Sequence, residues 1–424
     1  MLFGKTSFTV QALAQIAASS LPWRSDGLVV LVRGARGALR WGAPRWDGKK
    51  DRRVLLLGDV PLIVGESDDY WCPTCEKLLA LGAGREQVDQ QTLEIVRQAS
   101  TRTDAPLSRV VNDVSPLLRL LQDGVYVVSF VDHFPTNGQG EPFWSLSRQV
   151  RRLAASREVY VTEMALYRKA SGFPSFLLPT QPFGMCDWNQ VEKYRTEIRA
   201  GRATGAIAFW ADGFLSALLD GHHRATAALL ERMPLRCLTI ARCTGIRFDD
   251  GKRFLMVWEN LIPFETLPKE AVRLIERPMR AKPPAARALA LGGEHEDAGA
   301  DPHWPELLAA AKVFPDVEGV AALELVGDFS DERVRRLLES RSEREAGELW
   351  LVLHGLIASH DPRAIDVALR IGRGPWPQLW QEAFRFLATK RTPEVEKFFV
   401  EFIVRDEGAH PWLEKIATDY LATE

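Results

Sequence analysis

Residues 278–302 indicate how the chain is organised into domains. They are rich in alanine, glycine, proline and charged residues and contain few large apolar side chains. A segment of this composition cannot bury enough apolar surface to order itself, so we interpret it as a linker. We therefore expect separately folded parts on its two sides. The length of 424 residues agrees with this, because one ordinary core seldom serves so long a chain and two to four domains are expected.

The overall charge balance excludes some classes of partner. The formal net charge is −2 and the sequence pI is about 6.5, so no field draws the whole chain to DNA or to an anionic membrane. DNA is therefore not an expected partner. No apolar run reaches the roughly 18 residues that span a bilayer, and the N-terminus makes a poor secretory signal. The five cysteines do not form a disulfide framework, and we expect a cytoplasmic protein.

The region 1–150 alternates patterns typical of strands and helices. Short β-branched or leucine-rich runs bounded by glycine and charged residues predict strands, and one later segment has helical spacing. A loop rich in glycine and proline ends the region. We expect an α/β domain with strands at Gly27–Arg33, Arg53–Gly58 and Val125–Val131, a helix at Gln87–Ala99 and a loop at Asp132–Trp144.

The region 151–277 has the clearest local pattern in the chain. Two apolar runs separated by Ala-Asp-Gly predict a hairpin, an Asp-Gly pair stops its second strand, and a helix and a third strand follow. These elements are expected at Ala206–Trp210, Phe214–Leu219, His222–Met233 and Leu235–Ala241. The resulting order of hairpin, turn, helix and strand predicts an α+β domain.

The sequence Asp220-Gly-His-His-Arg224 stands where the second strand gives way to the helix. The start of a helix carries partial positive charge and suits an anion, to which Arg224 can add a bidentate fork. His222 and His223 can supply hydrogen bonds or a titratable base, and Gly221 lets the backbone approach a ligand closely. Asp220 could cap the helix or hold a divalent ion that accompanies a phosphate. The alternative interpretation is a simple turn with solvated basic side chains.

The run Leu219–Ala227, with a hairpin before it and a helix and a strand after it, resembles the ParB/sulfiredoxin superfamily. The expected helix Asn189–Ala200 and the glycine after it also match that family's order, so the resemblance covers about residues 155–245. The Asp-Gly-His-His-Arg version is similar to that of free-serine kinases and their relatives. The resemblance implies binding of ATP or CTP with Mg²⁺, with Gly221, His222, His223 and Arg224 at the nucleotide, Asp220 at the metal, and Asp220, His222 and His223 as catalytic candidates.

The sequence departs from this superfamily in three places. His222 stands where the sulfiredoxin reaction needs a cysteine, so that reaction is not expected. The kinase relatives need an upstream carboxylate, for which Glu158 and Glu163 are available at spacings that do not match. The DNA-clamping members continue into a helix-turn-helix, whereas this chain continues into Arg247–Met279 and the linker.

The motif Trp71-Cys-Pro-Thr-Cys75 resembles thioredoxin-like sites. If a helix begins at Cys72, both thiols share its first turn and its dipole stabilises a thiolate. The region 1–150 would then be a thioredoxin-like domain. Two other interpretations stay open: a zinc site completed by distant ligands such as Cys186 or His133, and a pair of ordinary structural cysteines.

Beyond the linker, the region 303–424 has helical patterns that recur at intervals of about 30 residues. Two of them open with a polar residue followed by proline, which is typical of a helix start. The segments are Ser330–Leu338, Gly347–Ala358, Asp361–Leu369 and Thr392–Phe399. The pattern resembles HEAT-type repeats and implies an α-solenoid that presents a surface to a protein partner.

The sequence thus predicts a multidomain chain of α/β, α+β and helical-repeat parts. Its first functional hypothesis is a nucleotide-binding protein, with phosphotransferase or nucleotide hydrolase activity. The second is a non-catalytic adaptor that uses the helical repeat, and the third is a thiol redox protein that uses Cys72 and Cys75.

Overall fold

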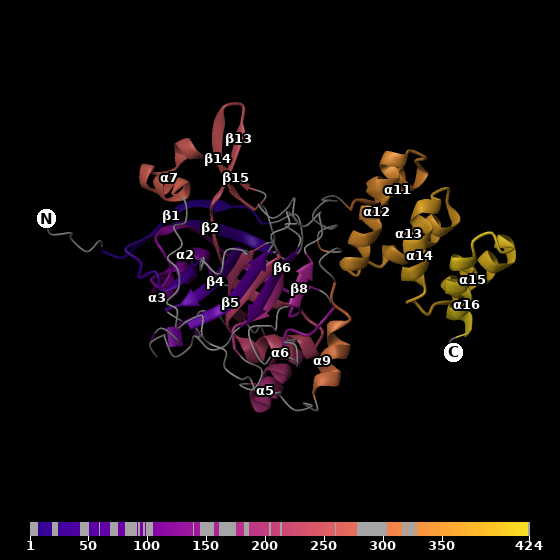
Figure 1. The fold of residues 1–424 in the computed structure, drawn as a ribbon, viewed down its shortest axis with the longest axis horizontal. Helices are drawn as coiled ribbons and strands as arrows, with labels where there is room; N and C mark the ends of the chain where they lie inside the picture. Colours follow the sequence, from indigo (N-terminus) through magenta and orange to yellow (C-terminus); the bar gives the residue numbers. More distant parts are fainter. Residues whose placement is uncertain are drawn as a thin grey trace. The chain divides into compact units, whose positions relative to one another are not determined.

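The computed structural model describes residues 7–18, 24–42, 51–58, 60–67, 75–80, 105–138, 140–144, 157–160, 175–181, 186–202, 205–212, 214–258, 260–277, 303–315 and 329–422, together with a few single positions. The chain divides into two compact units, Met1–Val317 and Glu318–Glu424 (Figure 1). The first unit mixes strands and helices, and the described part of the second is helical. No helix in the described residues is both long and apolar enough to cross a membrane.

A seven-stranded mixed sheet organises the first unit. Its strands lie in the order β1 (Thr9–Ile16), β2 (Arg24–Arg33), β7 (Gly124–His133), β12 (Leu235–Arg242), β10 (Gly205–Asp212), β11 (Leu215–Asp220) and β9 (Phe176–Pro179). Strand β7 lies between β2 and β12, and nearly all of its residues are buried, as its valine-rich apolar sequence predicts.

The sheet crosses the domain boundary that the sequence predicts near residue 150. Strand β7 pairs along its length with β12, and β2 pairs with β7 on the other side. The regions 1–150 and 151–277 therefore contribute strands to one sheet. Pairing between strands about 100 residues apart leaves no mark in the local sequence, so the local patterns could not show it.

The sheet also curls at its β9 edge. Phe134, the residue after β7, pairs with Phe176 of β9: its N–H donates to Ser175 O at 2.6 Å, and its carbonyl accepts from Leu177 N–H at 3.1 Å. Phe176 N–H donates in the other direction, to Phe214 O. Strand β9 thus pairs with β11 along one edge and with the end of β7 along the other. The strands β7, β12, β10, β11 and β9 therefore form a closed ring.

The described residues of the first unit also form two smaller antiparallel sheets. The first has the order β3 (Leu39–Gly42), β4 (Asp51–Leu57), β5 (Val60–Ser67), β6 (Cys75–Ala80) and β8 (Arg157–Tyr160). The second has the order β13 (Gly245–Asp249), β14 (Lys252–Val257) and β15 (Asn260–Pro263), and is followed by the short 3-10 helix η3 (Phe264–Thr266) and helix α7 (Lys269–Glu276). Two short helices, α2 (Leu107–Asp113) and α3 (Ser115–Leu118), precede β7.

Three helices lie together beside the main sheet: α5 (Trp188–Arg199), α6 (His222–Leu230) and α9 (Trp304–Ala311) (Figure 1). Small and apolar residues on one face of β9–β12, such as Leu177, Ala206 and Leu235, pack against α6 and α9. Helix α9 falls in the first unit, so the helical part begins later than the predicted residue 303.

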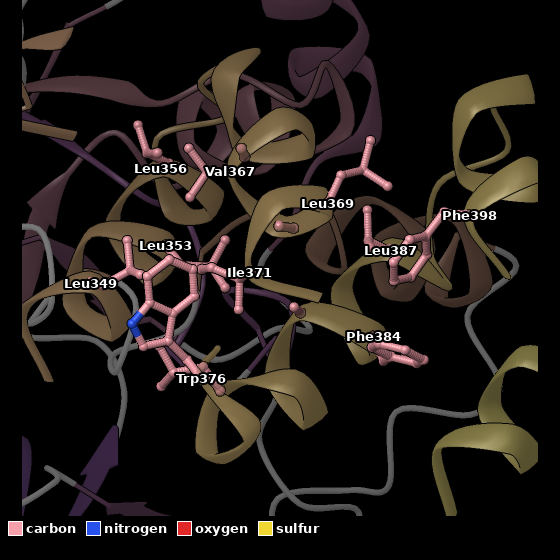
Figure 2. Close-up of a cluster of buried hydrophobic side chains, with 14 of the residues drawn as sticks. Leu349, Leu353, Leu356, Val367, Leu369, Ile371, Trp376, Phe384, Leu387 and Phe398 are labelled. Carbon is pink, nitrogen blue, oxygen red and sulfur yellow. The ribbon is translucent and has the colours of Figure 1, made fainter. Parts of the chain in front are cut away.

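The second unit has its own core. Its helices are α11 (Asp331–Glu339), α12 (Glu343–Ala358), α13 (Arg363–Arg373), α14 (Pro377–Leu387), α15 (Pro393–Asp406) and α16 (Pro411–Ala422). Leucines of α12, branched residues of α13 and aromatic residues of α14 and α15 fill the space between them (Figure 2). Thr392 caps α15 by accepting a hydrogen bond from Val395 N–H, as the Thr-Pro start predicts.

The thioredoxin-like interpretation of Trp71–Cys75 depends on a helix that begins at Cys72. Cys75 does not lie in the first turn of a helix but begins strand β6, which pairs with β5 and β8. Cys72 lies outside the described residues. The hydrogen-bonding of β6 on both edges holds this segment extended, so a helix dipole is not available to the Cys75 thiol in the way that the motif suggests.

Candidate functional site

The predicted turn between strand and helix forms at Gly221. Strands β9 and β11 are parallel neighbours and end at the same edge of the sheet, where ligands of α/β sheets commonly bind. Gly221 follows β11 with a φ of 108°, and α6 starts at the next residue. A Cβ at Gly221 would lie 2.7 Å from Ala206 Cβ, so only glycine lets the helix begin this close to β10.

His222 is buried at this turn, with 3% of its surface exposed. Its Nε2 accepts a hydrogen bond of 2.9 Å from the backbone N–H of Thr180, the residue that follows β9. The Thr180 hydroxyl donates to Leu218 O at 2.6 Å. Because Nε2 is an acceptor, the proton of the neutral ring is on Nδ1. His222 therefore ties the end of β9 to the start of α6.

Aromatic residues from the loop after β7 cover His222. The ring centroids of Phe143 and Trp144 lie 5.8 and 5.4 Å from that of His222. Trp144 Nε1 donates to the Thr226 hydroxyl at 2.6 Å, and this hydroxyl donates to His222 O at 3.0 Å. The end of β9 and the loop after β7 therefore both hold the first turn of α6 in position.

His223 joins α6 to α5. Its Nε2 accepts from the backbone N–H of Asp187 at 2.9 Å, and Asp187 Oδ1 in turn caps α5 by accepting from Asn189 N–H. At the other end of the two helices, Arg195 and Arg199 both pair with Glu231 at 2.6 Å. Helices α5 and α6 are thus parallel neighbours, and their positive N-terminal ends meet at the edge where β11 ends.

Arg224 is the most deeply placed charge of the motif. Its side chain is 7% exposed, and its Nη2 lies 2.5 Å from Asp220 Oδ2, whose side chain is 26% exposed. The guanidinium carbon lies 5.7 Å from the centre of the Tyr194 ring on α5. Burial of His222 and Arg224 does not fit the alternative of solvated first-turn side chains, because both are packed and hydrogen-bonded within the fold.

A metal would depend on a ligand for most of its coordination. In the part of the chain that the structure describes, no group of three or more His, Cys, Asp or Glu side chains could hold an ion. Burial raises the pKa of the nearby Cys237 thiol well above its usual range, so this thiol stays protonated and makes a poor ligand. Asp220 alone could contact a metal that arrives bound to a phosphate.

Sequence reasoning missed the partners of the motif. Thr180 and Asp187 bind the two histidines through backbone N–H groups, which carry no side-chain signal. Trp144 stands in the predicted loop Asp132–Trp144. Its large aromatic side chain, next to that of Phe143, is the sequence signal that could have shown that this part of the loop is buried. Glu158 lies in β8, in the five-stranded sheet, and Glu163 lies outside the described residues.

No family model matches the chain, and no curated protein or solved structure matches it either.

Proposed function

We propose that the protein binds a nucleotide, ATP or CTP with Mg²⁺, at the start of α6. The observation that carries this proposal is the meeting of the α5 and α6 N-terminal ends, held by the His223–Asp187 hydrogen bond, beside the Arg224 guanidinium. Each helix end has a charge of about +0.5, and such ends bind phosphate groups readily. The resemblance of Asp220–Arg224 to the ParB/sulfiredoxin superfamily agrees with this choice of ligand.

The acidic residues of the corner explain why the ligand would come with a metal. Asp187 and Asp220 offset much of the positive charge of the two helix ends and Arg224. A metal-free triphosphate would be repelled by these carboxylates, whereas Mg²⁺ on the phosphates would be attracted to Asp220.

The contacts assign different tasks to the residues of the motif. Arg224 would contact a phosphate through its guanidinium, which suits bidentate hydrogen bonding to phosphate oxygens. Gly221 would let the phosphate approach the backbone. His222 acts as a positioning residue through Thr180, and His223 is the better candidate for proton transfer because it is only partly buried. Phosphoryl transfer or nucleotide hydrolysis by positioning and charge neutralisation would then follow.

Isothermal titration with MgATP, MgCTP and the metal-free nucleotides tests the proposal. We expect Arg224→Ala to weaken binding at least tenfold, or about 1.4 kcal/mol. Arg236→Ala is a matched control, because Arg236 also pairs with an aspartate, Asp132, at 3.0 Å and also lies over an aromatic ring, 5.6 Å from that of Phe130. Wild-type protein that binds neither nucleotide would refute the proposal.

A second candidate function is that of an adaptor that binds a protein through the helical unit. This unit has a core of its own, and Val404 of α15 and Trp412 of α16 are 73% and 44% exposed. Affinity capture with the full chain tests it. The double variant Val404→Lys, Trp412→Ala should lose a specific partner, whereas Phe248→Ser, which removes a 72% exposed aromatic residue from the first unit, should keep it.

A thiol redox function rests on Cys72 and Cys75 and stays a prediction. It requires a disulfide between the two residues that forms and is reduced reversibly in a glutathione redox series. If the two thiols remain reduced across the series, this function is excluded.

A further inference from the structure

In the part of the chain that the structure describes, two buried polar atoms at the root of the loop after β7 have no hydrogen-bond partner. They are Nε2 of His133, the last residue of β7, and Oγ of Ser175, the residue before β9. Both residues are 0% exposed. Buried polar groups nearly always find a partner, and each one left without it costs about 1–3 kcal/mol. Two such atoms in one place therefore point to a missing third group.

The strand pairing places the two side chains next to each other. Phe134 lies opposite Phe176, so the residues before them, His133 and Ser175, are neighbours on adjacent parallel segments. Alternation along a strand gives them the same face of the sheet. Their neighbours agree, because Leu235, opposite His133, and Leu177, two residues after Ser175, both belong to the cluster that packs against α6 and α9.

The chemistry of the missing group follows from the histidine tautomer. Nδ1 of His133 lies 3.1 Å from Val131 O, which can only accept, so Nδ1 carries the ring proton. Nε2 is then an acceptor that needs a donor. The Ser175 hydroxyl can both donate and accept, but it does not bond to Nε2 directly. An uncharged group that donates a hydrogen bond to the imidazole and also forms a hydrogen bond with the serine would give both atoms a partner.

We propose that one ordered water molecule is bound between His133 and Ser175, donating to Nε2 and hydrogen-bonded to the Ser175 hydroxyl. Two polar partners in an otherwise apolar layer suit a single internal water, of which folded proteins hold roughly one per 27 residues. The water links the end of β7 to the start of β9, where the ring of strands closes. This site is separate from the proposed nucleotide site and does not depend on it.

Nitrogen-15 NMR of the full chain, with histidine labelled, tests the water directly. The chain has eight histidines, and His133→Gln assigns the signal. We expect the Nε2 signal of His133 to show the upfield displacement of an imine nitrogen that accepts a hydrogen bond. Ser175→Ala should reduce that displacement. The control Ser216→Ala removes another buried hydroxyl without a partner, on β11, and should leave the signal unchanged.

A crystal structure at high resolution gives a second measurement that needs no variant. We expect solvent density within hydrogen-bond distance of both His133 Nε2 and Ser175 Oγ. Wild-type protein with an Nε2 signal at the position of a nitrogen without a donor, or a well-ordered site with no density, would overturn the proposal. An equal response to Ser175→Ala and Ser216→Ala would also overturn it.

Discussion

We expect acid to lower the free energy of unfolding of the first unit, and we expect protonation of His133 to account for much of this loss. The side chain is wholly buried, and burial lowers its pKa from 6.5 to about 4, while the bond to Val131 O opposes this weakly. The unfolded chain then binds a proton between these two values that the folded chain does not. The free energy of unfolding therefore has its full value above about pH 6.5 and decreases as the pH falls towards 4.

The size of the effect follows from the two pKa values. Each pKa unit corresponds to about 1.36 kcal/mol, so the imidazole accounts for a loss of about 3 kcal/mol between pH 6.5 and pH 4. A domain with a total stability of about 5–15 kcal/mol loses a substantial part of it in this way. The variant His133→Phe keeps a ring of similar size in this layer and removes the titrating group.

Hydrogen exchange measured by mass spectrometry isolates this contribution. Peptides from β7 and β12 report the opening free energy of the sheet at several pH values, after correction for the intrinsic exchange rate. Acidic side chains titrate alike in wild-type protein and in His133→Phe, so the difference between their pH slopes belongs to the imidazole. A separate NMR titration should show one of the eight histidines unprotonated at pH 5.

Two results would refute this reasoning. The first is a His133 signal that titrates near pH 6.5, which would mean that the side chain reaches solvent. The second is a pair of parallel pH slopes for wild-type protein and His133→Phe. A lower stability of the variant at every pH would leave the comparison intact, because only the slopes are compared.

Three further substitutions and one control substitution test the packing of the two units by urea denaturation, with the unfolding of each unit followed through its own peptides. Gly221→Ala should cost more than about 2 kcal/mol, because it adds a contact with Ala206 to the strain at φ 108°, whereas Gly201→Ala, at φ 70° with open space around it, should cost about 1 kcal/mol. Equal losses would contradict the contact. Phe384→Ala removes a fully buried ring between α13 and α15 and should cost about 3–5 kcal/mol in the second unit alone. Thr392→Ala removes the cap of α15 and should cost about 1 kcal/mol, with the first unit unchanged.

Local sequence patterns predicted the individual elements well where each residue's own chemistry sets them. The valine-rich strand β7, the hairpin of β10 and β11 and the helix α6 form where apolar spacing and the Asp-Gly pair indicate. The failures concern pairing over long distances. Strand β7 pairs with β12 through backbone N–H and C=O groups, which every sequence has and which give no sequence signal. As a result, the two expected domains share one sheet.

The local structure at the Cys-Pro-Thr-Cys motif was undecided for a related reason. The same letters suit a helix start or a strand start, and β5 and β8 decide the matter by pairing with the segment that begins at Cys75. A helix there would pair its backbone groups within its own turns and leave none for β5 and β8. The motif's sequence carries no sign of those partners, so the sequence alone left the thioredoxin-like, zinc and structural interpretations open.

For the Asp220–Arg224 motif, the backbone conformation was predictable from the sequence and the side-chain partners were not. Its backbone was predictable because glycine at a positive φ and a helix start are properties of these residues themselves. Its side chains were not, since the acceptors on His222 and His223 are used by N–H groups of Thr180 and Asp187. Both histidines are therefore committed at Nε2 to holding β9 and α5 in place. Arg224 is the most deeply buried charged side chain of the motif and lies at the start of α6, which is why the proposed nucleotide site is best tested at that residue.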